Sequence, residues 1–504
     1  MILLINPPLV KPSEPPPGIA RLYGTLNAAG VKCAIIDANI EGILHLLAKS
    51  PTDSDRWTKR AVRNRTANLE FLRSVRGYCD IERYKRAVSD LNRLIEKSSQ
   101  SGGPVRLSLC NYQDLEHSAV RATDLFRAAE QYEKNPFHEY FSERISHAME
   151  LHSPDVVGVS LNFLSQALTA FSIIGFIRAR FGHVRIVLGG SLITSWVRRP
   201  GWKTPFSGLV DQIVDGPGEQ ALLDLAGVHE GNRRRRFSYD PFPMLDYFAP
   251  VPILPYSASC GCYWNRCAFC PEKAEGVRYE PVSPEAAARD ARELCSGRES
   301  ALIHFLDSAV SPAFLRKLSE SPPGVPWYGF VRITKMLADL DFCRALKLSG
   351  CTMLKLGLES GDQGVIDSEG KGIDLALASG ALASLKKAGI GTYVYLLFGT
   401  PSESEDEARN TLHFTLRHSP FIDFLNLAIF NMPINSPDAV KFATSPHYEG
   451  DLSLYTGFSH PKGWDRAKVR RFLDKEFKRQ PAIARILANE PPFFTSNHAP
   501  FFVS

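Results

Sequence analysis

Short apolar runs recur along the chain, each followed by a stretch with helical spacing, and this rhythm predicts alternating strands and helices. In the first half the runs lie at 2–6, 31–36, 155–161 and 184–190, and several of them end in Gly, Ser or Asn. Such alternation is typical of a doubly wound parallel sheet, so we predict an α/β, Rossmann-like domain there. Six strand-like runs between Leu254 and Met432 are too few for a closed eightfold barrel. They predict a partial (β/α)6 barrel of the TIM type.

Changes in the pattern divide the chain into parts. Residues 1–228 form the predicted Rossmann-like domain, interrupted at about 51–151 by charged, heptad-like stretches that we interpret as a helical insertion. Residues 229–252 are rich in charge, proline and aromatic rings and are expected to be a linker, in which the arginine block 233–236 is assigned no function. Residues 253–432 form the predicted barrel. Residues 433–504 form a C-terminal cap with one helix at 465–488 and an aromatic tail at 491–502.

Composition narrows the class of protein. No apolar run approaches the roughly 20 residues of a membrane helix, and the opening MILLINPPLVKP has no basic leader, so we expect a soluble, cytoplasmic protein. The 59 Lys and Arg exceed the 54 Asp and Glu by only five, and no basic stripe with interleaved aromatic residues suggests nucleic acid. In a cytoplasmic chain the ten cysteines are expected to be thiols or metal ligands rather than disulfides.

Four of the cysteines crowd into one segment, SASCGCYWNRCAFCPEK. Cys262, Cys267 and Cys270 are spaced C-x4-C-x2-C, and Cys260 adds a fourth thiol. Such a loop can wrap zinc or an iron–sulfur cluster. Zinc sites usually take a second pair of ligands from another segment, and no second C-x2-C or H-x3-H occurs in the sequence. The pattern favours a catalytic cluster, and leaves open a structural zinc or iron site and plain loop thiols.

From about Tyr256 to Met432 the sequence resembles the radical S-adenosylmethionine (SAM) enzymes. In that family three cysteines, usually C-x3-C-x2-C with an aromatic residue before the last, hold a [4Fe–4S] cluster whose fourth iron chelates SAM. The resemblance assigns Cys262, Cys267 and Cys270 as the ligands, although the first spacing is one residue longer than usual, and Phe269 as the aromatic residue. The Gly-Cys pair ending at Cys262 is similar to a common start of the family motif, which disfavours Cys260.

Other strand ends are similar to the family's SAM-binding segments. IHFLDSAVSP places Asp307 at the expected pocket mouth, and KLGLESG nominates Glu359 and Ser360 as SAM contacts. YLLFGTPSESEDE resembles the family's GFPGET strand end, which implies that Gly399 and Pro401 shape a turn beside the adenine and that Glu403 caps the next helix. From the residues alone, Glu403 and Glu405 are equally helix-dipole complements. Arg332 is the best cation for the SAM carboxylate, with a surface salt bridge as its alternative.

Residues 1–228 resemble the cobalamin-binding domain that precedes many radical SAM enzymes, outside the insertion. The similarity rests on NPP, DVVGVSLNFLSQ, VLGGSLIT and VDGPGE in that order. Glycine lets a backbone approach a flat ligand, and the resemblance implies a cobalamin lining formed by the following residues: Gly158, Ser160, Gly189, Gly190, Gly216, Gly218 and Glu219. No Asp-x-His-x-x-Gly motif occurs, which fits either a cobalamin without a histidine ligand or a domain that has lost the cofactor.

The resemblance implies a cobalamin-dependent radical SAM methyltransferase acting on an unactivated carbon or phosphorus centre. A 5′-deoxyadenosyl radical would remove hydrogen from the substrate, methylcobalamin would supply the methyl group, and a flavodoxin or ferredoxin would supply electrons. The alternatives are a non-methylating cyclisation, rearrangement or carbon–carbon bond formation, and, from another class, a redox-sensing iron–sulfur protein. The substrate, a small molecule or peptide, and the catalytic residues cannot be assigned. Asn431, Asn497 and His498 are candidate contacts, and we expect the aromatic tail to cover the substrate cavity.

Overall fold

The computed structural model describes residues 1–51, 55–99, 104–228, 236–298, 300–446, 450–492 and 498–503. Most of the predicted arginine block and Asn497, with much of the aromatic tail, lie outside this part of the chain. The described residues form two compact units. Unit 1 contains residues 1–252 with 450–454 and Pro492, and unit 2 contains 253–446, 455–491 and 498–503.

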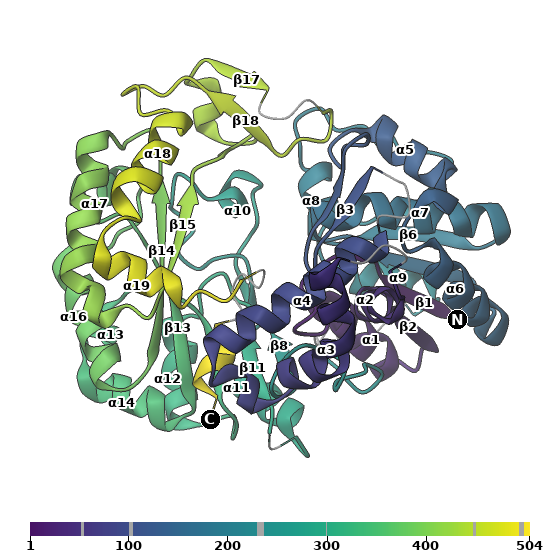
Figure 1. The fold of residues 1–504 in the computed structure, drawn as a ribbon, viewed down its shortest axis with the longest axis horizontal. Helices are drawn as coiled ribbons and strands as arrows, with labels where there is room; N and C mark the ends of the chain where they lie inside the picture. The colour runs from purple at the N-terminus through teal and green to yellow at the C-terminus, as the bar shows by residue number, and fades with distance from the viewer. Residues whose placement is uncertain are drawn as a thin grey trace. The chain divides into compact units, whose positions relative to one another are not determined.

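Unit 1 is built on a five-stranded parallel sheet in the order β2-β1-β5-β6-β7. Its central strands β1 and β5 are buried throughout, as expected for a sheet covered by helices on both faces. The order reverses direction at β1, which therefore marks the topological switch point. The elements are β1 (Ile2–Asn6), α1 (Pro17–Ala28), β2 (Cys33–Asp37), α2 (Ala38–Ala48), β5 (Val156–Ser160), α7 (Leu164–Arg180), β6 (Arg185–Gly189), α8 (Ser191–Val197), β7 (Gln212–Ile213) and α9 (Glu219–Leu225) (Figure 1).

The segment between α2 and β5 is mainly helical, with one feature that the hydrophobic pattern did not predict. A short antiparallel hairpin, β3–β4, joins the two helical halves. Its strands are three residues each, too short for a period of two to stand out from loop sequence. The elements are α3 (Arg56–Leu72), α4 (Ile81–Ser99), β3 (Val105–Leu107), β4 (Tyr112–Asp114), α5 (Ala122–Glu130) and α6 (His138–His152).

Unit 2 contains a six-stranded, wholly parallel sheet in the order β15-β14-β13-β12-β11-β8. Figure 1 shows α14, α16 and α17 beside β13–β15 in this unit. The predicted partial barrel is confirmed. Its strands are β8 (Ile253–Tyr256), β11 (Leu302–Phe305), β12 (Trp327–Val331), β13 (Cys351–Glu359), β14 (Gly391–Phe398) and β15 (Phe424–Ile429). The helices are α10 (Pro271–Ala274), α11 (Pro284–Cys295), α12 (Pro312–Glu320), α13 (Lys335–Ala338), α14 (Leu340–Leu348), α15 (Gln363–Ser368), α16 (Leu375–Lys387) and α17 (Glu405–His418), and a short ladder joins β9 (Ser259–Cys260) to β10 (Glu280–Pro281).

The C-terminal segment differs from the prediction of one helix at 465–488. It forms α18 (Arg466–Phe472), a single π-helical turn, and α19 (Pro481–Ala488). Proline lacks a backbone N–H and disfavours a helical residue before it, so the helix breaks ahead of Pro481, which then begins α19. A three-stranded antiparallel sheet, β16 (Met432–Pro433), β18 (Tyr455–Phe458) and β17 (Thr444–Pro446), precedes these helices.

The described part of the aromatic tail packs at the amino ends of the barrel strands. The phenyl ring of Phe502 lies where a side chain on Gly391, the first residue of β14, would be, and it contacts Phe424 at the start of β15. His498 is 1% exposed and lies against Tyr393. For this part, the expectation of a cover over the substrate cavity is wrong, because ligands of parallel sheets bind at the opposite, carboxyl ends of the strands.

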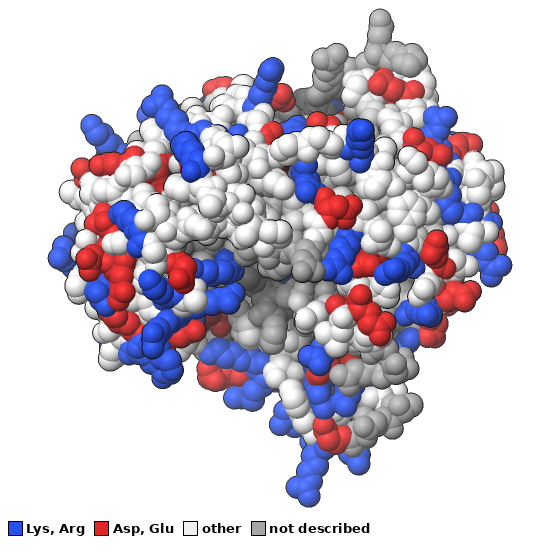
Figure 2. All heavy atoms as spheres, turned by 90° about the horizontal axis from the view of Figure 1, so that it is seen from above, with Lys and Arg blue, Asp and Glu red and all other residues white. Residues whose placement is uncertain are grey.

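The surface carries mixed charge. On the face shown in Figure 2, Lys and Arg side chains are interspersed with Asp and Glu. Among the described residues, no helix combines the length and the apolar character needed to cross a membrane.

Candidate functional site

The cysteine segment of unit 2 is a turn between β9 and α10. Gly261 has φ +69°, and a Cβ there would lie 2.5 Å from the carbonyl oxygen of Arg278, so only glycine fits. Cys270 directly precedes α10, and Cys262, Cys267 and Cys270 are all half-buried. Among the described residues, no three His, Cys, Asp or Glu side chains converge as closely as a single metal ion requires.

A second loop, residues 369–372, holds the cysteine turn in place. The Ala268 amide donates to the carbonyl oxygen of Glu369 at 2.8 Å, and the Trp264 indole N–H donates to that of Gly370 at 2.9 Å. Gly372, with φ +64°, leaves space for the Trp264 ring, which would lie 2.3 Å from a Cβ at that position. The position of the thiols therefore depends on a loop about 100 residues further along the chain.

Two cations lie beside the thiols. Arg332, after β12, donates to the carbonyl oxygen of Lys371 at 2.6 Å and stacks 3.9 Å from the centre of the Trp264 ring. The ammonium of Lys371 pairs with Glu359, the last residue of β13, at 2.7 Å. Burial raises the pKa of Cys267, and Lys371 and Arg332 act in the opposite direction. The cations therefore favour negative charge at this end of the barrel.

The structure brings only some of the predicted SAM-contacting residues to the end of the barrel beside the cysteine turn. Phe269, Arg332 and Glu359 gather around Lys371, whose ammonium lies 5.6 Å from the Phe269 ring. Ser360 is 1% exposed, and its hydroxyl is 3.0 Å from that of Thr411 on α17.

Asp307 is likewise not open at a pocket mouth. It is 4% exposed and accepts hydrogen bonds from the Ser259 hydroxyl and, at 3.1 Å, from the Ala258 amide. The prediction of an open position is wrong, because this carboxylate fastens the start of the cysteine turn to the end of β11.

The turn after β14 adopts the conformation that its glycine and proline allow. Gly399 has φ +79°, and its amide donates to Glu403. Ser404, not Glu403, is the N-cap of α17, and Glu407 completes the capping box. Glu403 is instead fully buried, where its carboxylate also accepts from the Trp464 indole N–H at 2.9 Å. Pro401 is partly exposed in this turn.

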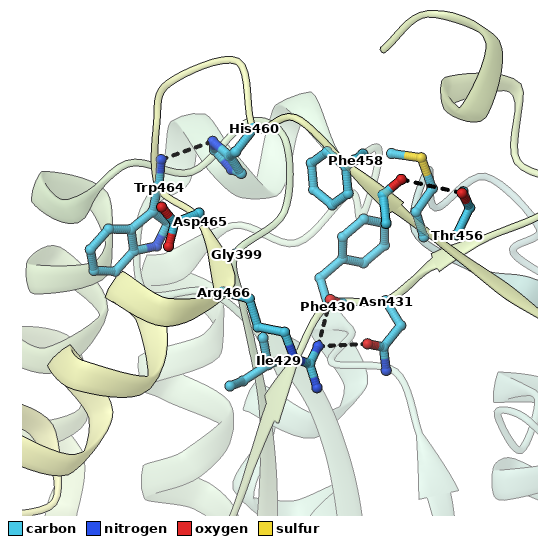
Figure 3. A pocket seen from close by; sticks show the side chains of 12 residues that line it. Gly399, Ile429, Phe430, Asn431, Thr456, Phe458, His460, Trp464, Asp465 and Arg466 are labelled. Atoms are coloured by element: carbon cyan, nitrogen blue, oxygen red, sulfur yellow. Dashed lines mark hydrogen bonds between the residues drawn. The ribbon is translucent and has the colours of Figure 1, made fainter. Parts of the chain in front are cut away.

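A pocket adjoins this turn at the carboxyl ends of β14 and β15 (Figure 3). The rings of Phe430, Phe458 and Trp464 line it, together with polar groups from the start of α18. Arg466 donates to Asn431 at 2.6 Å, which fixes both side chains in the wall. Aromatic faces with a few fixed polar groups are typical of sites for flat, polar ligands. Asn431, a candidate substrate contact, therefore lies in a pocket wall of unit 2.

In unit 1, most of the predicted lining lies at the carboxyl edge of the sheet. Ser160 ends β5, Gly189 ends β6, and Gly216 and Gly218 lie between β7 and α9. Gly190 has φ +112°, and a Cβ there would lie 2.3 Å from the carbonyl oxygen of Leu161. Side-chain hydrogen bonds connect the loops at this edge. The Ser191 amide donates to the Asn162 side chain, and the Gly216 amide donates to the Thr194 hydroxyl.

Two residues of the predicted lining differ from expectation. Gly158 lies in the middle of β5 and not at its end, where a Cβ would come within 2.8 Å of the Leu4 side chain. Packing within the sheet thus explains why residue 158 is a glycine. Glu219, the first residue of α9, forms an ion pair with Arg21 of α1. Phe163 was missed: it precedes α7 at this edge and is 59% exposed, unusual for a phenylalanine.

The remaining cysteines differ sharply in exposure. Cys79 is exposed, Cys33 and Cys110 are half-buried, and Cys295, Cys343 and Cys351 are buried. Burial raises the pKa of Cys295 to about 11 and that of Cys343 to about 12.

Residues 256–415 match the family described as the Radical SAM superfamily. Unit 2 therefore contains a radical SAM domain. The match begins in β8 and ends within α17, so it includes the cysteine turn, the loop 369–372 and the turn at Gly399.

Relatives and solved structures agree with this assignment. An uncharacterised methyltransferase of Pyrococcus horikoshii is 24% identical over 306 residues, which are 54% of this chain and 66% of that protein. The cobalamin-dependent radical SAM enzyme OxsB, with aqua-cobalamin bound, superposes with a TM-score of 0.57 at 13% identity, over 94% of this chain and 67% of OxsB. The radical SAM methyltransferase TsrM of Kitasatospora setae, with cobalamin and a [4Fe–4S] cluster bound, superposes with a TM-score of 0.54 at 16% identity, over 97% of this chain and 91% of TsrM. The predicted fold class is confirmed by these likenesses.

Sequence reasoning missed two residues of the radical SAM domain that hold its cysteine turn. Lys371 has a local signal, since it stands between two glycines, which mark a tight turn. Trp264 lies within the cysteine motif itself, yet its partner Gly370 is distant in sequence, so nothing local predicts their hydrogen bond.

Proposed function

We propose that this protein is a cobalamin-dependent radical SAM enzyme that transfers a methyl group to an unactivated carbon or phosphorus centre. The observation that carries the proposal is the cysteine turn held beside Arg332 and Lys371 at the carboxyl end of the barrel. A [4Fe–4S] cluster spreads its thiolates over a cube, farther apart than a single ion does. Half-buried thiols in one turn, next to two cations, fit such an anionic cluster.

The chain's own residues would hold the cofactors as follows. Cys262, Cys267 and Cys270 would bind three irons, and Arg332 or Lys371 would neutralise the SAM carboxylate. The pocket lined by Phe430, Phe458 and Trp464 offers aromatic faces to the adenine. The cluster would supply the electron that cleaves SAM, and cobalamin would carry the methyl group.

The carboxyl edge of unit 1 suits a large flat ligand. Backbone rather than side chain borders it at Gly189, Gly190 and Gly216, and Phe163 adds an exposed aromatic ring. Methyl transfer is favoured over the non-methylating alternatives because the Pyrococcus horikoshii relative and TsrM are both described as methyltransferases.

The first test is the metal content of protein that has been purified and reconstituted without oxygen and supplied with hydroxocobalamin. We expect about four irons and one cobalt per chain in the wild type. Cys262→Ala, Cys267→Ala and Cys270→Ala should each lose the cluster, whereas the matched control Cys260→Ala should keep it. Equal iron loss in all four variants would contradict the ligand assignment.

The second test separates the candidate activities. With SAM and a strong reductant, the wild type should form 5′-deoxyadenosine, and S-adenosylhomocysteine in the same reaction would report transfer of the SAM methyl group to reduced cobalamin, the step that precedes methylation of a substrate. 5′-Deoxyadenosine without S-adenosylhomocysteine would indicate non-methylating radical chemistry. A tightly held cluster without any SAM cleavage would indicate a redox sensor.

A further inference from the structure

One aromatic ring of the cysteine turn contacts two arginines. The centre of the Trp264 ring lies 3.9 Å from the guanidinium carbon of Arg332 and 5.0 Å from that of Arg266. Trp264 is half-buried and Arg266 is exposed, whereas Arg332 is only 7% exposed. Since Trp264 stands between the proposed cluster ligands Cys262 and Cys267, its ring joins the cysteine turn to the cation beside it.

The position of this ring is fixed by contacts that do not involve the arginines. The Trp264 indole N–H donates to the carbonyl oxygen of Gly370 at 2.9 Å, and the ring fills the space beside Gly372 that a Cβ would need. Asn265, directly after Trp264, has φ +46°, a left-handed conformation that non-glycine residues seldom adopt. Among the described residues only two other non-glycine residues have a positive φ, and one of them is Glu359 at the same site. Such conformations persist where the surrounding structure holds them in place.

Arg332 depends on the same loop for a second contact. It donates to the carbonyl oxygen of Lys371, the residue between the two glycines, at 2.6 Å. The loop therefore holds the indole and the guanidinium against each other. The ammonium of Lys371 pairs with Glu359 at 2.7 Å, whereas none of the ion pairs within the described part of the chain includes Arg332.

Stacking holds a guanidinium without occupying its hydrogen-bond donors. The N–H groups lie in the plane of the guanidinium, and an aromatic ring contacts its face. The edge can therefore bind a carboxylate through two parallel hydrogen bonds while the ring fixes the plane. An ammonium has no such plane, so a ring in this position suits Arg332 and would not orient a lysine in the same way.

We propose that Trp264 is a positioning residue of the SAM site, whose ring holds the guanidinium of Arg332 in the plane that meets the carboxylate of SAM. That this carboxylate belongs to SAM rests on the proposed function, whereas the hold of the ring on Arg332 is measured without SAM.

The first measurement is the rate at which phenylglyoxal, a reagent for arginine, modifies Arg332 in the folded, cluster-reconstituted protein. Peptide mass spectrometry reads this rate relative to that of Arg316, an exposed residue of α12. Arg332 should react slowly in the wild type and about tenfold faster in Trp264→Leu, because loss of a desolvated cation–π contact releases the guanidinium. Trp264→Phe keeps an aromatic face and should stay near the wild type. An unchanged rate in Trp264→Leu would overturn the proposal.

The second measurement compares SAM with decarboxylated SAM, which lacks only the carboxylate, in equilibrium dialysis without reductant. In Trp264→Leu the preference for SAM over decarboxylated SAM should fall about tenfold. Equal weakening of both ligands would show that the ring is merely structural and would refute its action on the carboxylate. Arg332→Met should lose the same preference, and the double variant should lose no more, because both residues act through one contact.

Gly372→Ala moves the ring without replacing it, because the new Cβ would lie 2.3 Å from Trp264. This variant should reproduce both effects of Trp264→Leu. Gly276→Ala is its control, with a similar φ of +69° and nothing within 4 Å of the Cβ, and should change neither readout. Trp57→Leu is the control for loss of a stacked indole, since Trp57 lies 5.0 Å from Arg93 in unit 1.

Iron content, measured on every sample, reports whether the cysteine turn still holds its cluster. If Trp264→Leu loses iron, Gly372→Ala decides by the same two readouts. A wild type that binds no SAM would contradict the proposed function and, with it, the role toward the carboxylate. The phenylglyoxal rates would still decide whether Trp264 holds Arg332.

Discussion

Replacement of Glu403 by glutamine should remove a pH dependence of stability from unit 2. Glu403 is fully buried, its Oε2 accepts from the Gly399 amide and the Trp464 indole N–H, and its Oε1 is buried without a hydrogen-bond partner among the described residues. Burial raises the pKa of Glu403 from 4.5 to about 7, and the nearby carboxylates of Glu407 and Glu369 act in the same direction. Glutamine has the same shape and cannot ionise.

The sign and size follow from proton linkage. Because the folded protein binds this proton more tightly than the unfolded chain, the neutral carboxyl contributes stability that is fully present below about pH 4.5. That stability is lost as the pH rises through about 7. The whole shift corresponds to about 3 kcal/mol, of which about 2 kcal/mol falls between about pH 5.5 and about pH 8.

The assay is guanidinium unfolding of the wild type and Glu403→Gln at these two pH values, followed by tryptophan fluorescence. Between the lower and the higher pH, the free energy of unfolding of the wild type should fall by about 2 kcal/mol more than that of Glu403→Gln. Glu405→Gln is the matched control, because Glu405 is exposed two residues further on and pairs with Arg409 at the surface. If the wild type and Glu403→Gln lose the same free energy, the buried carboxyl does not titrate in this range and the reasoning fails.

Three further predictions concern other parts of the chain. Gly190→Ala should lower the free energy of unfolding by about 2–3 kcal/mol, since its Cβ meets a backbone oxygen, whereas Gly208→Ala, with φ +87° and nothing within 4 Å, should cost only about 1 kcal/mol in chemical denaturation. His498→Ala should destabilise unit 2 by about 1–3 kcal/mol with the iron content unchanged, because it removes a buried imidazole that packs on Tyr393 and bonds to the half-buried Glu490 at the amino ends of the strands. Lys371→Met should weaken SAM binding about tenfold in equilibrium dialysis by leaving Glu359 without its cation, and unaltered binding would remove Lys371 from the site.

The parallel strands of both sheets were predictable because they are buried on both faces. Runs such as ILLIN at β1 and VVGVS at β5 are buried throughout and almost wholly apolar, and serine or asparagine ends them where a loop must turn. The cysteine turn was predictable for a different reason. Its chemistry depends on spacing within nine residues, Cys262 to Cys270, which sequence displays directly.

What could not be predicted depends on contacts between distant segments. Asp307 looked like a pocket residue from its strand end, and only the position of Ser259 shows that it fastens the cysteine turn. The hydrogen bond of Ser360 was not predictable, because its partner, Thr411, lies 51 residues away on α17. Gly158 and Gly190 were both expected in the cobalamin lining, and only the packing of Leu4 and Leu161 shows that both glycines avoid a clash.

Because the thiols differ in exposure, their alkylation can measure how much of the protein carries the iron–sulfur cluster. In the native protein a thiol alkylating reagent should modify Cys79 first and should reach the buried Cys295, Cys343 and Cys351 only on unfolding. Between these extremes lie Cys260, Cys262, Cys267 and Cys270. Peptide mass spectrometry would then read occupancy residue by residue: iron should shield three of these four sulfurs and leave Cys260 open to modification, in the same sample used for the metal analysis.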